Sequence, residues 1–216
     1  MSEHTDPVSH ALVEYIGAHA PAEGAFLAEL RAAAHAAGLP QISIAAEQAQ
    51  FMRILLQLHG ARQVLEVGTL GGYSAIAMAR GLPADGKLIT VEVEPAHAEF
   101  AKTWIARSDV ADRIEVRTGR GIDVLPTLPD ASADAAFLDA DKVSYAAYLP
   151  HCLRIVRSGG VILVDNAFAF GHLLDPKNQE PSVSAIRAFN ETVARHPELD
   201  GVLVPLGDGL WVARRK

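Results

Sequence analysis

Two short stretches in the second half of the sequence end in oxygen-bearing side chains. "FLDADK", Phe137 to Lys142, and "VILVDN", Val161 to Asn166, each begin as an apolar run that is typical of a buried strand. If the two strands are neighbours, roughly 5 Å apart in a parallel sheet, Asp139, Asp165 and Asn166 converge at their carboxyl ends. Two carboxylates and an amide oxygen suit Mg²⁺, and without a cation such close carboxylates would repel each other and raise a pKa. The alternative is that each aspartate caps a following element.

Lys142 follows Asp139 by one helical turn, so we expect it to face the same site. A nearby divalent cation would lower the pKa of its ammonium group, which would make it a proton acceptor. Alternatively, Lys142 is a solvated side chain paired with Asp139 or Asp141. The nine histidines include no H-x-x-H or H-x₃-H pair, so none is predicted to bind metal, and only His172 is expected near the site.

A glycine-rich turn, "EVGTLGGYS", runs from Glu66 to Ser74 after another apolar run. Gly68 would allow a sharp turn, and the two glycines after it would let a ligand approach the backbone. Glu92 ends the next apolar run, where a carboxylate can accept hydrogen bonds from both ribose hydroxyls of an adenine nucleoside. The spacing is not G-x-G-x-x-G, which disfavours a dinucleotide, and Glu66 suits a ligand with an ammonium or sulfonium group. A tight turn without a ligand is the alternative.

Helices and strands that would position these residues follow a regular order. The first third predicts helices at Val8–Ala18, Gly24–Ala37 and Ala45–His59, because apolar residues recur there at helical spacing. From Gln63 onward, strands are expected at 63–68, 87–93, 113–119, 134–140, 159–166, 201–207 and 209–215, with helices at 73–82, 96–108, 122–128, 145–156 and 182–196. This alternation predicts an α/β fold with a mostly parallel sheet, helices on both faces and an antiparallel hairpin at one edge. The segment Gly171–Pro181 is expected to be a surface loop that borders the site.

Bulk properties favour one compact domain, with residues 1–60 as a helical cap and 61–216 as the core. A net charge of −7 disfavours nucleic acid as a partner. No apolar stretch approaches the ~20 residues that span a bilayer. The first residues show no basic segment followed by an apolar core, so no secretion signal is expected. Cys152 is the single cysteine, which predicts an inert buried thiol, no internal disulfide and a cytoplasmic location.

Five stretches together resemble the cation-dependent O-methyltransferases, a family that includes catechol and caffeoyl-CoA O-methyltransferases. They are "LEVGTLGGYS", "VEVEP", "FLDADKVSY", "VDN" and "PLGDGLWVARR", and the likeness runs from about Gln41 to the C-terminus. The resemblance implies a doubly wound, Rossmann-like sheet of seven strands with extra N-terminal helices. It also implies S-adenosylmethionine as methyl donor, Mg²⁺ or another divalent cation, and a homodimer.

The same resemblance assigns roles to individual residues. It places the cofactor on Ile44, Glu66, Gly68, Thr69, Ser74, Glu92, Gly121 and Asp139, the metal on Asp139, Asp165 and Asn166, catalysis on Lys142 and Asp139, and substrate on Asp141 and Phe170. Two stretches depart from the family pattern. "GRG", with Arg120 and Gly121, stands where relatives usually carry Ala, and "AFAF", with Ala169 and Phe170, stands where plant members have Trp and then Asn.

The resulting hypothesis is methyl transfer to one hydroxyl of a vicinal diol on an aromatic ring. A coenzyme A ester needs basic residues for its phosphates, and up to His59 the chain offers only Arg31 and Arg53 against six acids. A small catechol-type phenol is therefore favoured over an acyl-CoA phenol or a hydroxylated tRNA uridine. Two other classes stay open, an NAD-dependent dehydrogenase and a nucleoside-binding module without catalytic activity.

Overall fold

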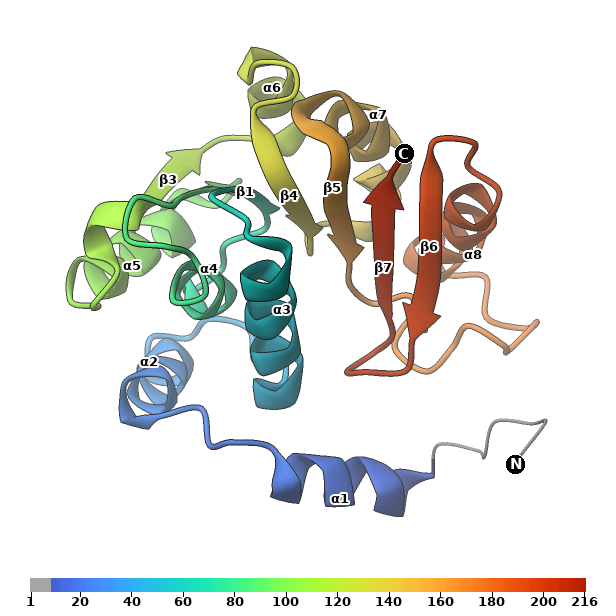
Figure 1. Cartoon of the computed structure of the whole chain (residues 1–216). Helices are drawn as coiled ribbons and strands as arrows, with labels where there is room; N and C mark the ends of the chain where they lie inside the picture. The colour runs from blue at the N-terminus through green and yellow to red at the C-terminus, as the bar shows by residue number, and fades with distance from the viewer. Residues whose placement is uncertain (1–8) are drawn as a thin grey trace.

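The computed structural model describes residues 9–216 as a seven-stranded sheet in the order β3-β2-β1-β4-β5-β7-β6 (Figure 1). Its strands are β1 (Gln63–Val67), β2 (Lys87–Glu92), β3 (Ile114–Thr118), β4 (Ala133–Leu138), β5 (Val156–Val164), β6 (Leu199–Val204) and β7 (Leu210–Arg215). Its α-helices are α1 (His10–His19), α2 (Ala25–Ala36), α3 (Ala46–His59), α4 (Tyr73–Ala79), α5 (Pro95–Ala106), α6 (Gly121–Val124), α7 (Tyr145–Ile155) and α8 (Pro181–Ala194).

Strand pairing brings the predicted site residues to one edge of the sheet. Strands β1 to β5 pair in parallel, and β4 lies between β1 and β5. The register sets Leu138 opposite both Val67 and Val164, so the three strands end at the same level. Strand β7 runs antiparallel to β5 and to β6, which confirms the expected hairpin at the sheet edge. The prediction that the strand before Asp139 and the strand before Asp165 are neighbours is confirmed, because β4 pairs with β5.

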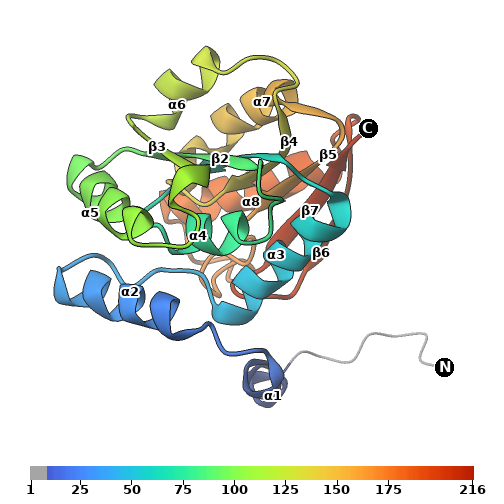
Figure 2. The same ribbon diagram turned by 60° about the vertical axis from the view of Figure 1, so that its left-hand side comes forward.

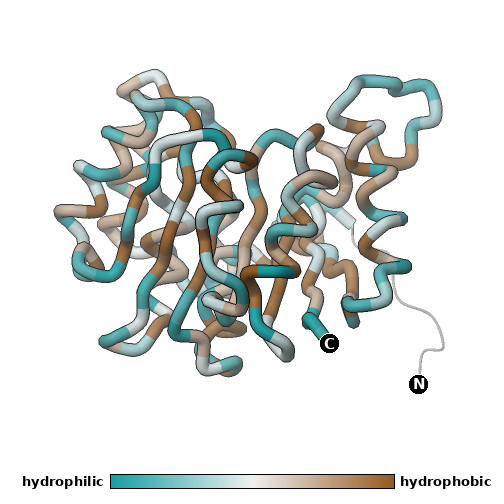
Figure 3. The backbone as a smooth tube through the Cα atoms, turned by 90° about the horizontal axis from the view of Figure 1, so that it is seen from above, coloured by the Kyte–Doolittle hydropathy of each residue, from teal (hydrophilic) through white to brown (hydrophobic). Residues whose placement is uncertain are grey.

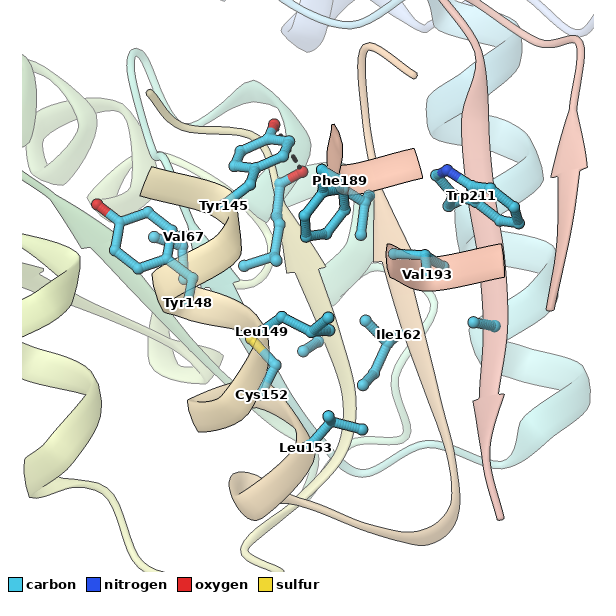
Figure 4. Close-up of a cluster of buried hydrophobic side chains, with 14 of the residues drawn as sticks. Val67, Tyr145, Tyr148, Leu149, Cys152, Leu153, Ile162, Phe189, Val193 and Trp211 are labelled. Atoms are coloured by element: carbon cyan, nitrogen blue, oxygen red, sulfur yellow. Dashed lines mark hydrogen bonds between the residues drawn. The ribbon is translucent and has the colours of Figure 1, made fainter. Parts of the chain in front are cut away.

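Helices lie on both faces of the sheet (Figure 2), and a hydrophobic cluster packs each face. One cluster packs α7 and α8 on the sheet, and Figure 4 shows its centre, where Tyr145 meets Phe189 edge-on with ring centroids 5.4 Å apart. The other packs α2, α3, α4 and α5 on the opposite face. Hydrophobic residues recur along the central strands while the outer turns are mostly hydrophilic (Figure 3). Both faces of the strands are therefore covered, as their unbroken apolar runs require.

The N-terminal helices differ in how they attach to this core. Helix α3 buries Gln48, Ala49, Met52 and Leu56 at helical spacing. It ends at Gly60, which takes the left-handed conformation with φ of 71°. Helix α1 buries none of its residues, and Figure 1 shows it standing away from the sheet. No helix of the described residues is long and apolar enough to cross a membrane.

Element boundaries differ from the predicted ones mainly at helix ends. The first predicted helix began at Val8, which lies outside the described residues, and α1 spans His10–His19. The predicted helix at 122–128 divides into α6 and a 3₁₀ turn at Leu125–Thr127. Pro126 explains the division, because proline has no backbone N–H to continue an α-helix. Residues 165–180 form neither helix nor strand, which agrees with the predicted loop at Gly171–Pro181.

The buried position of Cys152 leads to a simple test of this packing. The thiol has no exposed surface in the cluster beneath α7, and burial raises its pKa to about 12. We expect the native protein at pH 8 to be inert to Ellman's reagent, whereas protein in guanidinium chloride should release one equivalent of thionitrobenzoate. The denatured sample is the control. Fast stoichiometric release from the native protein would contradict this packing of α7.

Candidate active site

A close backbone contact joins the glycine turn to the end of β4. Gly68 has φ of 104°, and a Cβ atom built on it would lie 1.8 Å from the carbonyl oxygen of Asp139. The amide of Asp139 donates to the carbonyl of Val67 at 2.9 Å. Only glycine satisfies both the backbone conformation and the space. The turn therefore lies directly against the segment that carries Asp139 and Lys142.

Glu92 holds this turn from the end of β2. Its Oε2 accepts hydrogen bonds from the backbone amides of Thr69 at 3.1 Å and Leu70 at 2.7 Å, and its Oε1 accepts from that of Glu94 at 2.9 Å. The carboxylate also lines the cavity, as its predicted ribose-binding role requires. Glu92 thus shapes the turn in addition to facing the site, a role that was not predicted from the sequence.

Glu66 lies beneath the turn with no exposed surface. Its Oε2 accepts a hydrogen bond from the hydroxyl of Thr90 at 2.5 Å, while its Oε1 is buried without a partner among the described residues. Burial raises the pKa of this carboxyl to about 8, and the hydroxyls of Ser74 and Thr90 oppose the shift. A cationic ligand group beside Oε1 would restore the charged form.

Asp165 and Asn166 follow β5, next to Asp139 after β4. The amide of Asp165 donates to the carbonyl of Leu138 at 3.0 Å, which fixes the two strand ends together. Burial, and then the charge of Asp139, raises the pKa of Asp165 to about 6. Asp165 Oδ1 is buried and makes no hydrogen bond to any described residue. A buried, unpaired carboxylate oxygen beside a second carboxylate is costly unless a cation occupies the space.

Asn166 adopts a left-handed backbone conformation at the end of β5. Its φ is 61°, which asparagine tolerates better than most other non-glycine residues. Its Nδ2 donates to Asp208 Oδ2 at 3.2 Å, so the amide oxygen remains available to coordinate a metal ion. Asp208 Oδ2 also accepts from the amide of Phe170 at 2.7 Å. The turn between β6 and β7 therefore holds the segment after β5.

These donors fit a hard divalent cation. Within residues 9–216, no group of three or more His, Cys, Asp and Glu side chains is placed to hold a metal. The predicted set has only two carboxylates, Asp139 and Asp165, and takes its third oxygen from the amide of Asn166, a combination that is compatible with Mg²⁺. In the described chain, neither Asp139 nor Asp165 caps a helix through its side chain, so the capping alternative does not hold. The unpaired Asp165 Oδ1 is the observation that favours a cation.

Lys142 is neither solvated nor distant from the site. Its Nζ donates to Asp139 Oδ1 and to the hydroxyl of Tyr145, both at 2.9 Å. Its side chain is 10% exposed and lines the cavity. The alternative interpretation, a solvated lysine paired with Asp139 or Asp141, holds for the pairing with Asp139 but not for the solvation. Asp141 instead accepts from Tyr148 at 2.9 Å and from Ser144.

One cavity of about 470 Å³ gathers most of the predicted residues. The predicted residues that line it are Ile44, Gly68, Thr69, Ser74, Glu92, Gly121, Asp139, Asp141, Lys142, Asn166 and Phe170. Glu66 and Asp165 do not line it and are buried just behind its surface. His172, which was expected near the site, is absent from the lining in the described chain, and His97 is present.

The departure at Gly121 has a steric reason. A Cβ atom there would lie 2.9 Å from the ring of Tyr148, which packs over the glycine and also lines the cavity. The hydroxyl of Tyr148 then reaches Asp141 at 2.9 Å. The missing side chain at Gly121 thus leaves room for the tyrosine that fixes Asp141.

Gln48, His97 and Tyr148 are among the residues in or beside the site that were not predicted from the sequence. Gln48 is 1% exposed on α3, and its amide lies close enough to Asp165 to favour the ionised carboxylate. Neither Gln48 Nε2 nor Asp165 Oδ1 makes a well-formed hydrogen bond within residues 9–216. A glutamine on the apolar face of a predicted helix was the available signal. His97 and Tyr148 gave no such signal, because each reaches the site through tertiary packing.

Comparisons with known proteins identify the family of this chain. The family model described as O-methyltransferase matches residues 17–216. A catechol O-methyltransferase of Niastella koreensis is 38% identical over 204 residues, covering 93% of this chain and 90% of that protein. A catechol O-methyltransferase of Mycobacterium tuberculosis is 42% identical over 178 residues, covering 82% and 80%.

Solved structures give the same result. The O-methyltransferase of Bacillus cereus in complex with SAH has a TM-score of 0.86 and 35% identity, covering 95% of this chain and 97% of that one. The O-methyltransferase TomG of Streptomyces achromogenes in complex with SAM has a TM-score of 0.85 and 33% identity, covering 95% and 96%. The resemblance found in the sequence is confirmed, and the chain belongs to the family of S-adenosylmethionine-dependent O-methyltransferases.

Proposed function

We propose that this enzyme transfers a methyl group from S-adenosylmethionine to one hydroxyl of a small catechol-type acceptor and requires a divalent cation, Mg²⁺ or a similar ion. The observation that carries this proposal is the buried, unpaired Asp165 Oδ1 beside Asp139 and Lys142. The two relatives named catechol O-methyltransferase support the acceptor class. NAD-dependent dehydrogenation, an alternative at the sequence level, is disfavoured because the chain belongs to the methyltransferases.

Different residues would bind the metal, accept the proton and orient the cofactor. Asp139, Asp165 and the amide oxygen of Asn166 would hold the cation, which when bound lowers the pKa of a coordinated hydroxyl. Lys142 Nζ is placed to take the proton from the acceptor hydroxyl. Glu66, Gly68, Thr69, Ser74, Glu92, Gly121 and Ile44 would orient the cofactor. Holding the acceptor oxygen in line with the methyl group supplies much of the acceleration.

The cavity lining favours a small acceptor. In the described chain its basic side chains are Lys142 and His97, and no arginine lines it. The phosphates of a coenzyme A ester or of tRNA would have few partners there. Ile42, Val93 and Phe170 are more than half exposed and give apolar contacts in the lining. These features support a phenol of limited size, with Asp141 and Phe170 contacting it.

A homodimer and a cytoplasmic location complete the proposal. Helix α1 exposes Leu12, Val13 and Ile16 by 43% or more, and such a helix gains stability when a second subunit covers it. The single thiol of Cys152 is buried and needs no oxidising environment.

Lys142→Ala should separate catalysis from cofactor binding. Because the general base is lost, we expect kcat to fall roughly 10²- to 10⁴-fold. The Kd for S-adenosylhomocysteine, measured by calorimetry, should change little, because Lys142 is proposed to act on the acceptor hydroxyl. Lys102→Ala is the matched control, since Lys102 pairs with Glu99 on the surface. Unchanged turnover with a catechol panel would show that Lys142 is not the base.

Removal of the metal should abolish transfer reversibly. We expect EDTA-treated enzyme to lose methylation of every catechol in the panel and to recover it with Mg²⁺. In the absence of substrate, Mg²⁺ at 100 times its Kd should stabilise the wild type by about 2.7 kcal/mol, measurable by thermal unfolding. Asp165→Asn should lose this stabilisation, whereas Asp123→Asn, on an exposed surface, should keep it. Full activity in EDTA would contradict the metal requirement, and no transfer under any condition would favour a non-catalytic module.

Glu66 should make cofactor binding depend on pH. With a pKa of about 8, its carboxyl is mostly protonated at pH 6 in the ligand-free protein. If an ammonium group binds there, the proton must leave, so affinity should rise with pH from 6 to 8, by up to about tenfold per unit. Calorimetry with S-adenosylhomocysteine in buffers of different ionisation enthalpy would detect the released proton. Glu66→Gln should bind more weakly and lose this pH dependence, while a pH-independent wild type would exclude the role.

A further inference from the structure

The segment between α2 and α3 forms a thin wall of the cavity. Residues 40–44 contribute Pro40, Ile42, Ser43 and Ile44 to its lining. Leu39 and Ile44 are buried at the two ends of the segment, whereas Ile42 is 68% exposed. Figure 2 shows α2 and the connection to α3 lying outside the sheet layer, next to α4.

This wall borders a second cavity and makes few hydrogen bonds. The second cavity, of about 340 Å³, is lined by Pro40, Gln41 and Ser43 together with Arg31 and His35 of α2. Within residues 9–216, the five residues 40–44 together take part in only one hydrogen bond. That bond runs from Arg31 Nη2 to the carbonyl oxygen of Ile44, at 3.2 Å. The position of the wall therefore depends on Arg31 and on the buried side chains at its ends.

Arg31 is itself held by a cluster of charged and aromatic groups. Glu23 Oε2 accepts from Arg31 Nη2 at 3.0 Å and from Arg31 Nε at 3.4 Å. The same oxygen accepts from the hydroxyl of Tyr73 at 2.7 Å, and the guanidinium lies 4.3 Å from the centroid of the Tyr73 ring. Burial raises the pKa of Tyr73 to about 12, so its hydroxyl stays a donor at neutral pH.

This cluster connects two parts of the cavity lining that are far apart in the sequence. Tyr73 is the first residue of α4, directly after the glycine turn, and it lines the cavity. Ile44 lines it from the segment between α2 and α3. We propose that Arg31 is a positioning residue for the cofactor: through Glu23 and Tyr73 it takes its position from the glycine turn, and through the carbonyl of Ile44 it sets the wall formed by residues 40–44. The inference rests on the proposed function only in placing S-adenosylmethionine in this cavity.

The geometry requires arginine in particular. A guanidinium has a planar set of donors that can serve Glu23 and Ile44 at once and still stack on Tyr73. A lysine ammonium at the same place could form one or two of these contacts but cannot stack as a plane. The conservative substitution should therefore rescue binding only in part.

Arg31→Met keeps an apolar stem of similar length and removes all the donors. We expect the Kd for S-adenosylhomocysteine, measured by calorimetry, to rise roughly tenfold, with Arg31→Lys in between. KM for S-adenosylmethionine should rise in parallel, while kcat at saturation stays within threefold because no reacting atom contacts Arg31. The ligand-free melting temperature should shift by only a few degrees. Arg195→Met is the control, since Arg195 is exposed and pairs with Glu191 on the surface, and it should leave Kd unchanged.

The outcomes separate this inference from the proposed function. If the wild type binds S-adenosylhomocysteine and both Arg31 variants bind it equally well, the positioning role is overturned while the cofactor assignment stands. If the wild type does not bind it, the cofactor assignment itself fails. A fall in kcat as large as the rise in KM would also overturn the positioning role. Should Arg31→Met fail to fold, Tyr73→Phe tests the same cluster by removing one donor to Glu23, and an unchanged Kd there would overturn the inference.

Discussion

The backbone contact between Gly68 and Asp139 is the constraint on which the site depends. Strands β1 and β4 end at the same level, and the chain after each strand has to pass the other without space for a side chain. This approach places a nucleoside-type glycine turn against an acidic segment that would otherwise belong to a separate loop. The residues proposed for the cofactor and for the acceptor are therefore neighbours because of sheet register. Such proximity is what methyl transfer between two bound groups requires.

Four carboxylates gather at this sheet edge, and the structure satisfies each of them differently. Glu92 accepts hydrogen bonds from three backbone amides, and Asp139 pairs with Lys142. Glu66 retains its proton over part of the neutral pH range, because burial raises its pKa to about 8. Asp165 has the least compensation, with one oxygen lacking any partner in the described chain. Buried charge of this kind costs stability in the ligand-free protein. A cationic cofactor and a divalent ion would remove that cost, so the electrostatics of these carboxylates favour the proposed ligands.

The acids and the wall at residues 40–44 are held in place by different parts of the chain. The acids are fixed by strand ends and by the β6–β7 turn, where Asp208 holds Asn166 and Phe170. The wall comes from the connection between two N-terminal helices, borders two cavities and is held by one hydrogen bond, from Arg31. The position of the wall therefore depends on the Arg31 cluster, whereas that of the acids depends on the sheet.

The sequence by itself determined the order of elements, the seven-stranded sheet, the glycine turn and the donors at the ends of β4 and β5. These follow from local signals, namely apolar runs, glycine spacing and polar residues at fixed positions. Only the tertiary structure decided how those groups are satisfied. It shows that Glu92 shapes the turn, that the ring of Tyr148 fills the space beside Gly121, that His97 lines the cavity, that Gln48 approaches Asp165 and that Arg31 bonds the carbonyl of Ile44. The physical reason is that hydrogen bonding and burial depend on residues far apart in the chain. A one-dimensional pattern records which face a side chain occupies, but not which partner it meets there.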